Sequence, residues 1–288
     1  MSFNILREME PFTQRLFNEI IGFQERDHPA WDESQAFEKR IANLPLHYLI
    51  FSNADRNPET HGPTVAHYYP LQKEMQTITD YAKQVADKPV VLDVHARNGF
   101  IGSLLAREGL DVIGLRDGKE KPNQIENFYD KTCYRMENRC LSDIDFPVDV
   151  LFSSWMPSTV DITEDVVRLN PKLVVYVFTK HINEYSGERQ TGTSQSFGEK
   201  LPASYKIVDE WEVTRIENLL NEIWPDLSPN IEEKRFVRIY ANTGFHDIKI
   251  NDNRPPAKGY DWEKELLMAE TAHEAKKTMK ERGFPING

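Results

Sequence analysis

Cysteine is scarce in this sequence and long apolar runs are missing, and each absence excludes a class of protein. The two cysteines, Cys133 and Cys140, lie in one segment at a spacing that matches neither a metal site nor a redox pair. No run of about 18 apolar residues occurs, which argues against a transmembrane helix. The N-terminal residues carry acids early and lack the apolar core of a secretory signal. We therefore expect a reduced, cytoplasmic protein with no membrane partner.

Positive charge is also in short supply. With 35 Lys and Arg against 46 Asp and Glu, the net charge is −11. Because affinity for nucleic-acid backbones comes largely from Lys and Arg, this balance argues against general nucleic-acid binding. The sequence has no G-x-S-x-G or G-x-x-x-x-G-K-[ST] pattern, the signatures of two large enzyme classes. Its eight histidines are scattered, so we expect no metal site.

The chain is long enough for a core domain with an added lobe, since it has 288 residues of which 39% are apolar. Residues 1–88 are predicted to form an N-terminal helical lobe or lid, because apolar residues such as Phe12 and Leu16 recur there at helical spacing. We expect the core domain at residues 89–250. Residues 251–288 are predicted to form a charged helical tail.

From residue 89 onward, predicted strands alternate with predicted helices. The apolar strands among the first five lack alternation, which is typical of a parallel sheet covered on both faces. The last two alternate apolar and polar residues, as in an antiparallel edge pair. The strand candidates are residues 90–94, 111–115, 133–139, 148–153, 173–178, 205–214 and 235–241, with helices at 100–107 and 162–169. This order predicts an α/β fold, a Rossmann-like doubly wound and mostly parallel seven-stranded sheet with an antiparallel edge pair, plus the helical lobe.

The most informative segment is residues 89–117, PVVLDVHARNGFIGSLLAREGLDVIGLRD. A buried strand ends in Asp93, and a tight turn, a short helix and a second strand follow. Such a βαβ unit binds its ligand at the carboxyl end of the first strand. Glycine suits this turn best because the backbone comes close to the ligand. The turn has one glycine, Gly99, and it also contains the large side chains of His95 and Arg97.

The order of elements over residues 89–245 resembles that of class I S-adenosylmethionine-dependent methyltransferases. In that family the first strand ends in an acid, here Asp93, followed by three glycines at alternate positions. His95 and Arg97 occupy the first two glycine positions and Gly99 the third. The resemblance implies S-adenosylmethionine as cofactor. The cofactor-binding residues that it implies in this turn are Asp93, His95, Arg97, Asn98 and Gly99.

Two interpretations of His95 and Arg97 stay open. Two donor side chains beside a helix N-terminus suit a carboxylate, such as that of a methionine group. Their bulk is equally consistent with a blocked cofactor site. A third interpretation is that the turn is only a structural part of a βαβ unit, because one fold hosts many functions.

The resemblance also implies acids after the second and third strands. The family's ribose-binding acid falls on Arg116 in direct register, and Asp117 takes that role if the strand ends one residue later. The alternative for Asp117 is a solvated turn. After the third strand, Asp143 is the candidate for the adenine amino group.

The fourth predicted strand ends in SSWMPS, at the second edge where ligands of open α/β sheets lie. The resemblance places Ser154 among the cofactor residues. Trp155 and Met156 would provide an apolar wall for a substrate or for the adenine ring; the alternative for Trp155 is that it packs under the neighbouring helix. Pro157 is the only part of the family's amine-binding motif in place, so methylation of a base amine is not supported. Two tyrosines precede the core where many family members carry a lid. The predicted substrate-binding residues are Trp155, Met156, Pro157, Tyr68 and Tyr69.

Residues 187–197, GERQTGTSQSF, follow the fifth predicted strand and are rich in hydroxyl groups. They are either a functional loop at the active edge or an ordinary connection into a helix capped by Thr193 or Ser194.

These features predict a methyltransferase acting on a small-molecule or protein substrate. Methyl transfer depends mainly on positioning, so no catalytic side chain is identified. The alternative is a methyltransferase-like domain without catalysis that serves as a binding or interaction module. A nicotinamide-dependent oxidoreductase is disfavoured because the G-x-G-x-x-G pattern is absent.

Overall fold

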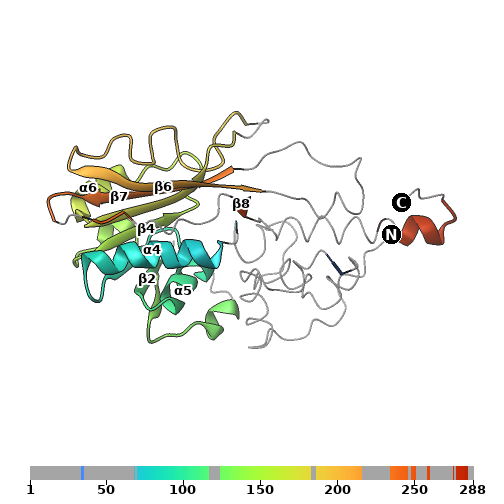
Figure 1. Ribbon diagram of the computed structural model, residues 1–288, viewed down its shortest axis with the longest axis horizontal. Coiled ribbons are helices and arrows are strands. Elements are labelled where there is room, and N and C mark those ends of the chain that lie inside the picture. The colour runs from blue at the N-terminus through green and yellow to red at the C-terminus, as the bar shows by residue number, and fades with distance from the viewer. Residues whose placement is uncertain are drawn as a thin grey trace.

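The computed structural model describes residues 34–35, 68, 70–116, 124–182, 186–215, 234–245, 248–250, 258–259, 275 and 277–284 (Figure 1). Its centre is one mixed sheet with the strand order β3-β2-β1-β4-β5-β7-β6-β8. The strands are β1 (Val90–Asp93), β2 (Asp111–Leu115), β3 (Tyr134–Glu137), β4 (Val150–Ser154), β5 (Leu173–Thr179), β6 (Tyr205–Arg215), β7 (Lys234–Asn242) and β8 (Lys258–Gly259). The helices are α4 (Gln72–Val85), α5 (Phe100–Arg107) and α6 (Thr163–Leu169), with 3-10 turns η3 (Gln124–Phe128) and η4 (Leu141–Asp143).

The predicted arrangement of parallel and antiparallel strands is confirmed. Strand β1 pairs in parallel with β2 and β4, and β3 and β5 extend the parallel part outward. Strand β7 lies antiparallel between β5 and β6. The sequence did not indicate β8, a two-residue strand that pairs with the end of β6. From β1 the chain adds β2 and β3 on one side, and it then returns to add β4 and β5 on the other side. The carboxyl ends of β1 and β4 therefore flank the crevice where such sheets bind ligands.

Two apolar cores cover the two faces of the sheet. Helices α4 and α5 pack on one face, through residues such as Ile78 and Leu105 (Figure 1). Helix α6 packs on the other face through Val166. All seven side chains of β5 are buried, which explains why its sequence shows no polar alternation.

Helix α4 is part of this packing although it precedes residue 89. Its Tyr81 hydroxyl donates a hydrogen bond of 2.9 Å to Asp209 on β6, and both side chains are buried. The rest of the predicted lobe falls outside the described residues, apart from residues 34–35, 68, 70–71 and 86–88. So does most of the predicted tail helix at residues 262–282. Within the described ranges, no helix combines the length and apolar character needed to cross a bilayer.

Candidate functional site

The turn between β1 and α5 keeps a tight course despite its two large side chains. Arg97 has a φ of 53° and Gly99 a φ of 81°, both in the left-handed region. The Gly99 N–H donates to the Ala96 carbonyl at 2.6 Å. Helix α5 then begins at Phe100, whose N–H donates to the Asn98 side-chain oxygen at 3.1 Å. Arg97 therefore adopts a backbone conformation that glycine tolerates better.

His95 joins this turn to the neighbouring strand. Its Nδ1 lies 2.9 Å from the hydroxyl of Ser153 on β4, which fixes the imidazole at the crevice between β1 and β4. Burial lowers the pKa of His95 to about 4, and the charge of Arg97 lowers it further. The imidazole is consequently neutral at pH 7, and Arg97 supplies the positive charge of this turn.

Asp93, the last residue of β1, is a buried carboxylate with no hydrogen-bond partner among the described residues, on either oxygen. It is 1% exposed. Burial raises its pKa to about 7, and the nearby backbone N–H of His95, which does not meet hydrogen-bond geometry, offsets part of that rise. Burying an unpaired carboxyl costs folding free energy, and such groups cluster at functional sites.

Three buried tyrosines lie within electrostatic range of this carboxyl. Burial raises the pKa of the Tyr68, Tyr129 and Tyr134 hydroxyls, and the Asp93 carboxylate raises each of them further. The Tyr129 hydroxyl donates to the Asn98 carbonyl at 2.8 Å, and its ring meets Tyr134 edge-on with centroids 5.2 Å apart. No sequence pattern indicated that Tyr129 and Tyr134 lie near this carboxyl.

Glycines make room for Tyr134. A Cβ on Gly102 of α5 would lie 2.7 Å from the Tyr134 ring and 2.6 Å from an Asp93 oxygen. A Cβ on Gly114 of β2 would lie 2.5 Å from the Tyr134 hydroxyl. Because these glycines have no side chain, α5 and β2 can approach the tyrosine closely, and Tyr134 fills the space between them.

The end of β4 carries the predicted substrate side. The Ser154 hydroxyl lies 3.1 Å from the Tyr68 hydroxyl, and Trp155 stacks on the Tyr68 ring with centroids 5.4 Å apart. Trp155 itself has a φ of 54°, so its backbone is strained. Met156 is fully buried in the core on the α6 face, and Pro157 is exposed. Tyr69 lies outside the described residues.

The residues predicted to contact ribose and adenine are Arg116 or Asp117 and Asp143. Arg116 follows β2 directly and is buried in an ion pair with Glu126, while its Nε donates to the Asn138 side chain at 3.0 Å. Asp117 lies outside the described residues. Asp143 is exposed in η4, where it accepts a hydrogen bond from the neighbouring Ser142 hydroxyl at 3.2 Å. Among the described residues, no cluster of His, Cys, Asp or Glu side chains has the arrangement of a metal site.

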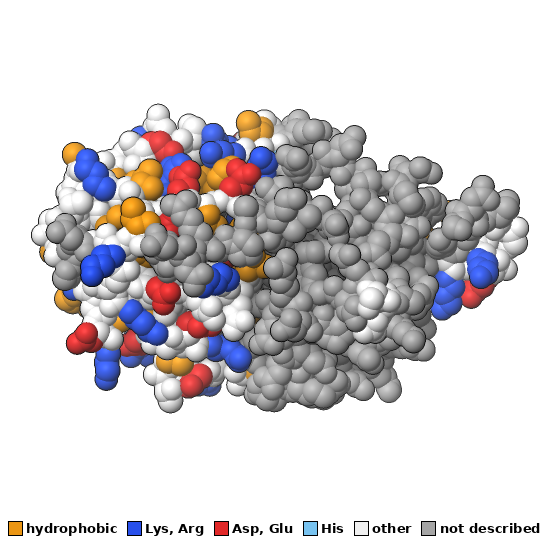
Figure 2. Space-filling view, viewed as in Figure 1, with side chains coloured by type: hydrophobic (Ala, Val, Ile, Leu, Met, Phe, Trp, Pro, Cys, Tyr) orange, Lys and Arg blue, Asp and Glu red, His pale blue; other side chains and the backbone are white. Residues whose placement is uncertain are grey.

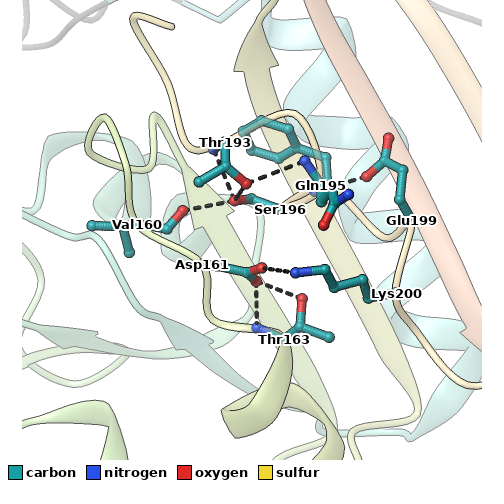
Figure 3. Close-up of polar contacts among 9 residues, drawn as sticks. Val160, Asp161, Thr163, Thr193, Gln195, Ser196, Glu199 and Lys200 are labelled. Atoms are coloured by element: carbon teal, nitrogen blue, oxygen red, sulfur yellow. Dashed lines mark hydrogen bonds and ion pairs between the residues drawn. The ribbon is translucent and has the colours of Figure 1, made fainter. Parts of the chain in front are cut away.

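The hydroxyl-rich loop after β5 is held by internal hydrogen bonds (Figure 3). The Ser196 hydroxyl donates to the Val160 carbonyl at 2.7 Å, and the Thr193 hydroxyl accepts from the Gln195 N–H at 3.1 Å. Residues 194–200 form turns, so the prediction of a capped helix there was wrong. The hydroxyl of Thr193 closes a local turn instead. Threonine side chains can bond the backbone in turns as well as at the start of a helix, and here the turn is formed.

Comparison with known proteins gives structural likeness only. No family model and no curated protein matches the sequence. The 1,6-didemethyltoxoflavin-N1-methyltransferase of Burkholderia thailandensis, solved with S-adenosylhomocysteine, is 14% identical over 59% of this chain and 78% of that chain, with a TM-score of 0.39. An rRNA methylase of Streptococcus thermophilus is 10% identical over 60% of this chain and 98% of that chain, with a TM-score of 0.38.

At these TM-scores the likeness decides nothing by itself, and the sheet is the basis for assigning the fold. Five parallel strands in the order β3-β2-β1-β4-β5 are followed by β7, which is antiparallel to both β5 and β6. That is the strand order of class I S-adenosylmethionine-dependent methyltransferases, and this chain has a class I methyltransferase-like fold.

Proposed function

We propose that the chain binds S-adenosylmethionine at the carboxyl ends of β1 and β4 and is a methyltransferase for a small-molecule or protein substrate. The observation that carries this proposal is the Asp93 carboxylate, which is buried without a hydrogen-bond partner among the described residues. It ends β1 beside the crevice where open α/β sheets bind ligands. An ammonium group of a ligand would provide the missing donors.

The residues of the turn fit the two ends of a methionine group. Asp93 would accept a hydrogen bond from its ammonium. Arg97 and the backbone N–H groups at the start of α5 would hold its carboxylate. Such a fixed arrangement of donors and acceptors requires little reorganisation when the ligand binds.

The end of β4 would face the acceptor. When bound, S-adenosylmethionine supplies a methyl group on a positively charged sulfur. The chain's part is to orient the acceptor against the stacked rings of Tyr68 and Trp155 and to exclude water. The Tyr68 hydroxyl has a raised pKa and so stays protonated, and its hydrogen-bonded pair with Ser154 has one hydroxyl proton left to donate there. Asp117, Asp143, Tyr69 and Pro157 stay predictions for the remaining contacts.

The surface supports a small-molecule or protein partner over a nucleic acid. On the face shown in Figure 2, Lys and Arg side chains are interspersed with Asp and Glu side chains over the described part of the chain. A nucleic-acid-binding surface would concentrate positive charge on one face.

Calorimetric titration with S-adenosylmethionine and S-adenosylhomocysteine tests this proposal directly. We expect both ligands to bind, with a dissociation constant below about a millimolar, a range in which calorimetry detects binding free energies of roughly 4 kcal/mol or more. Absence of heat with both ligands near millimolar concentration would contradict it.

A second candidate function is a methyltransferase-like binding module without catalysis, and Arg116 favours it. In direct register Arg116 holds the position of the family's ribose-binding acid, and its guanidinium is committed to Glu126 and Asn138. In that case ribose recognition is weak, and the domain serves to bind another ligand or a partner.

Replacing Arg97 by glycine separates the two candidates. For a methyltransferase, Arg97→Gly should weaken S-adenosylhomocysteine binding about tenfold, because it removes a charge-assisted contact to the carboxylate. The folded state should gain about 1 kcal/mol, because glycine adopts a φ of 53° without strain. Tighter binding in the variant would favour a turn blocked by the arginine, and hence the inactive module. Calorimetry and urea unfolding measure the two effects.

A further inference from the structure

Tyr68 is held over the ends of the parallel strands by contacts from several elements. Its ring is 2% exposed, although the residue lies before α4 and outside the regular elements. Ser154 and Trp155 contact it from β4, as described above. From the antiparallel side of the sheet, the guanidinium of Arg235 on β7 lies over the ring, 4.5 Å from its centroid. Such a cation–π contact is strongest where water is excluded.

Arg235 is fixed in turn by a buried acid. It pairs with Glu74 in the first turn of α4, and the two side chains are 6% and 1% exposed. Glu74 also accepts hydrogen bonds from the Trp211 indole at 3.1 Å and from the Leu71 N–H at 2.8 Å. Burying both charges costs desolvation free energy, so an ion pair of this kind is weak evidence for a role in stability alone.

We propose that Arg235 and Glu74 are positioning residues of the ligand site at Asp93: they hold the Tyr68 ring in place over the carboxyl ends of β1 and β4. The antiparallel edge of the sheet then sets the shape of a site formed by the parallel strands. The identity of the ligand rests on the proposed function, whereas the position of Tyr68 does not.

Tyr68 is the part of the Asp93 surroundings that depends on this pair. The groups that interact electrostatically with the carboxyl are the backbone N–H of His95 and the hydroxyls of Tyr68, Tyr129 and Tyr134. Tyr129 is tied to the turn by its own hydrogen bond, and Tyr134 is a residue of β3. Loosening Tyr68 would therefore admit water to Asp93 while the other two rings stay in place.

The experiment uses the double variant Glu74→Gln/Arg235→Met, which removes both buried charges together and leaves neither one unpaired. Titration of the Asp93 carboxyl is followed by carbon NMR in ligand-free, aspartate-labelled protein, with Asp93→Asn to assign the signal. We expect the midpoint to fall by at least about one pH unit from its wild-type value, because hydration stabilises the charged form. Binding of S-adenosylhomocysteine should weaken about tenfold, as for the loss of one well-placed contact.

Tyr81→Phe is the matched control, because it removes another buried tyrosine hydrogen bond of the same structural region, to Asp209. It should leave both the Asp93 midpoint and ligand binding unchanged. If the double variant does not fold, Arg235→Lys replaces it: an ammonium keeps the charge opposite Glu74 but lacks the planar guanidinium over the Tyr68 ring, and a smaller fall in midpoint is expected. A folded variant with the wild-type midpoint would overturn the inference and leave the pair a purely structural contact. Failure of the wild type to bind S-adenosylhomocysteine would contradict the proposed function instead, and the titration would still decide the role of the pair.

Discussion

Replacing Asp93 by asparagine should remove a pH-dependent loss of stability worth about 4 kcal/mol. The pKa of this carboxyl rises from 3.8 to about 7 on folding, and a shift of about 3 units corresponds to about 4 kcal/mol. Between these two values the folded protein keeps a proton that the unfolded chain has released. Wild-type stability from this group is therefore present at pH 4 and is lost as the pH rises through 7.

Urea unfolding of wild type and Asp93→Asn at a series of pH values measures the effect. Asparagine carries no charge, so the free energy of unfolding of the variant, relative to wild type, should increase by about 4 kcal/mol between pH 4 and pH 8. Effects of all other titrating groups are common to both proteins and cancel. A difference that stays constant across this range would show that Asp93 is hydrated in the folded state, against the burial on which the proposed site depends.

The same substitution should weaken ligand binding although it stabilises the protein at pH 8. Loss of a charge-assisted hydrogen bond to an ammonium should reduce the affinity for S-adenosylhomocysteine about 10- to 100-fold. The control is Asp145→Asn, which changes a carboxyl that is 84% exposed, and it should bind like wild type. A gain in stability with unchanged affinity would separate the buried acid from the ligand site.

The order and direction of the strands could be predicted because the parallel strands are buried on both faces, which leaves short apolar runs between turn residues. The bounds of β2 and α5 agree with the prediction to the residue. Strand β3 is shorter than predicted, at Tyr134–Glu137, and it lies at the edge of the sheet. Strand β8 has two residues, too few for any periodicity to indicate.

The candidate site could be predicted only where its residues follow one another in sequence. The turn from Asp93 to Gly99 has local chemistry that points to a ligand. Tyr134 lies near this turn because β3 pairs with β2, in a register that sets Met136 opposite Gly114. That pairing joins residues that are distant in sequence. Arg235 and Glu74 are 161 residues apart, and charged residues are ordinarily expected at the surface, so no sequence pattern would have paired them.

Replacing Gly102 by alanine should destabilise the protein by about 2 kcal/mol, although alanine is the better helix former by about 1 kcal/mol. Gly102 lies inside α5 and is buried, and an added methyl group would come within 2.6 Å of an Asp93 oxygen and 2.7 Å of the Tyr134 ring. Neither neighbour can retreat easily, because Asp93 is part of β1 and Tyr134 is part of β3. Overpacking therefore outweighs helix propensity. Urea unfolding at a fixed pH gives the free energy.

The cause of that loss can be tested in a second background. In Tyr134→Leu, which lacks the aromatic ring that the new methyl group would strike, Gly102→Ala should cost clearly less, and the difference between the two costs is the coupling between the sites. A second measurement follows from the Asp93 contact: forcing the carboxyl away from α5 should also weaken S-adenosylhomocysteine binding in Gly102→Ala. If Gly102→Ala left the free energy of unfolding unchanged or increased it, the space between α5 and the side chains of Asp93 and Tyr134 would be large enough for a methyl group. The carboxyl would then have room for water, and the absence of a hydrogen-bond partner at Asp93 would no longer indicate a site built for a ligand.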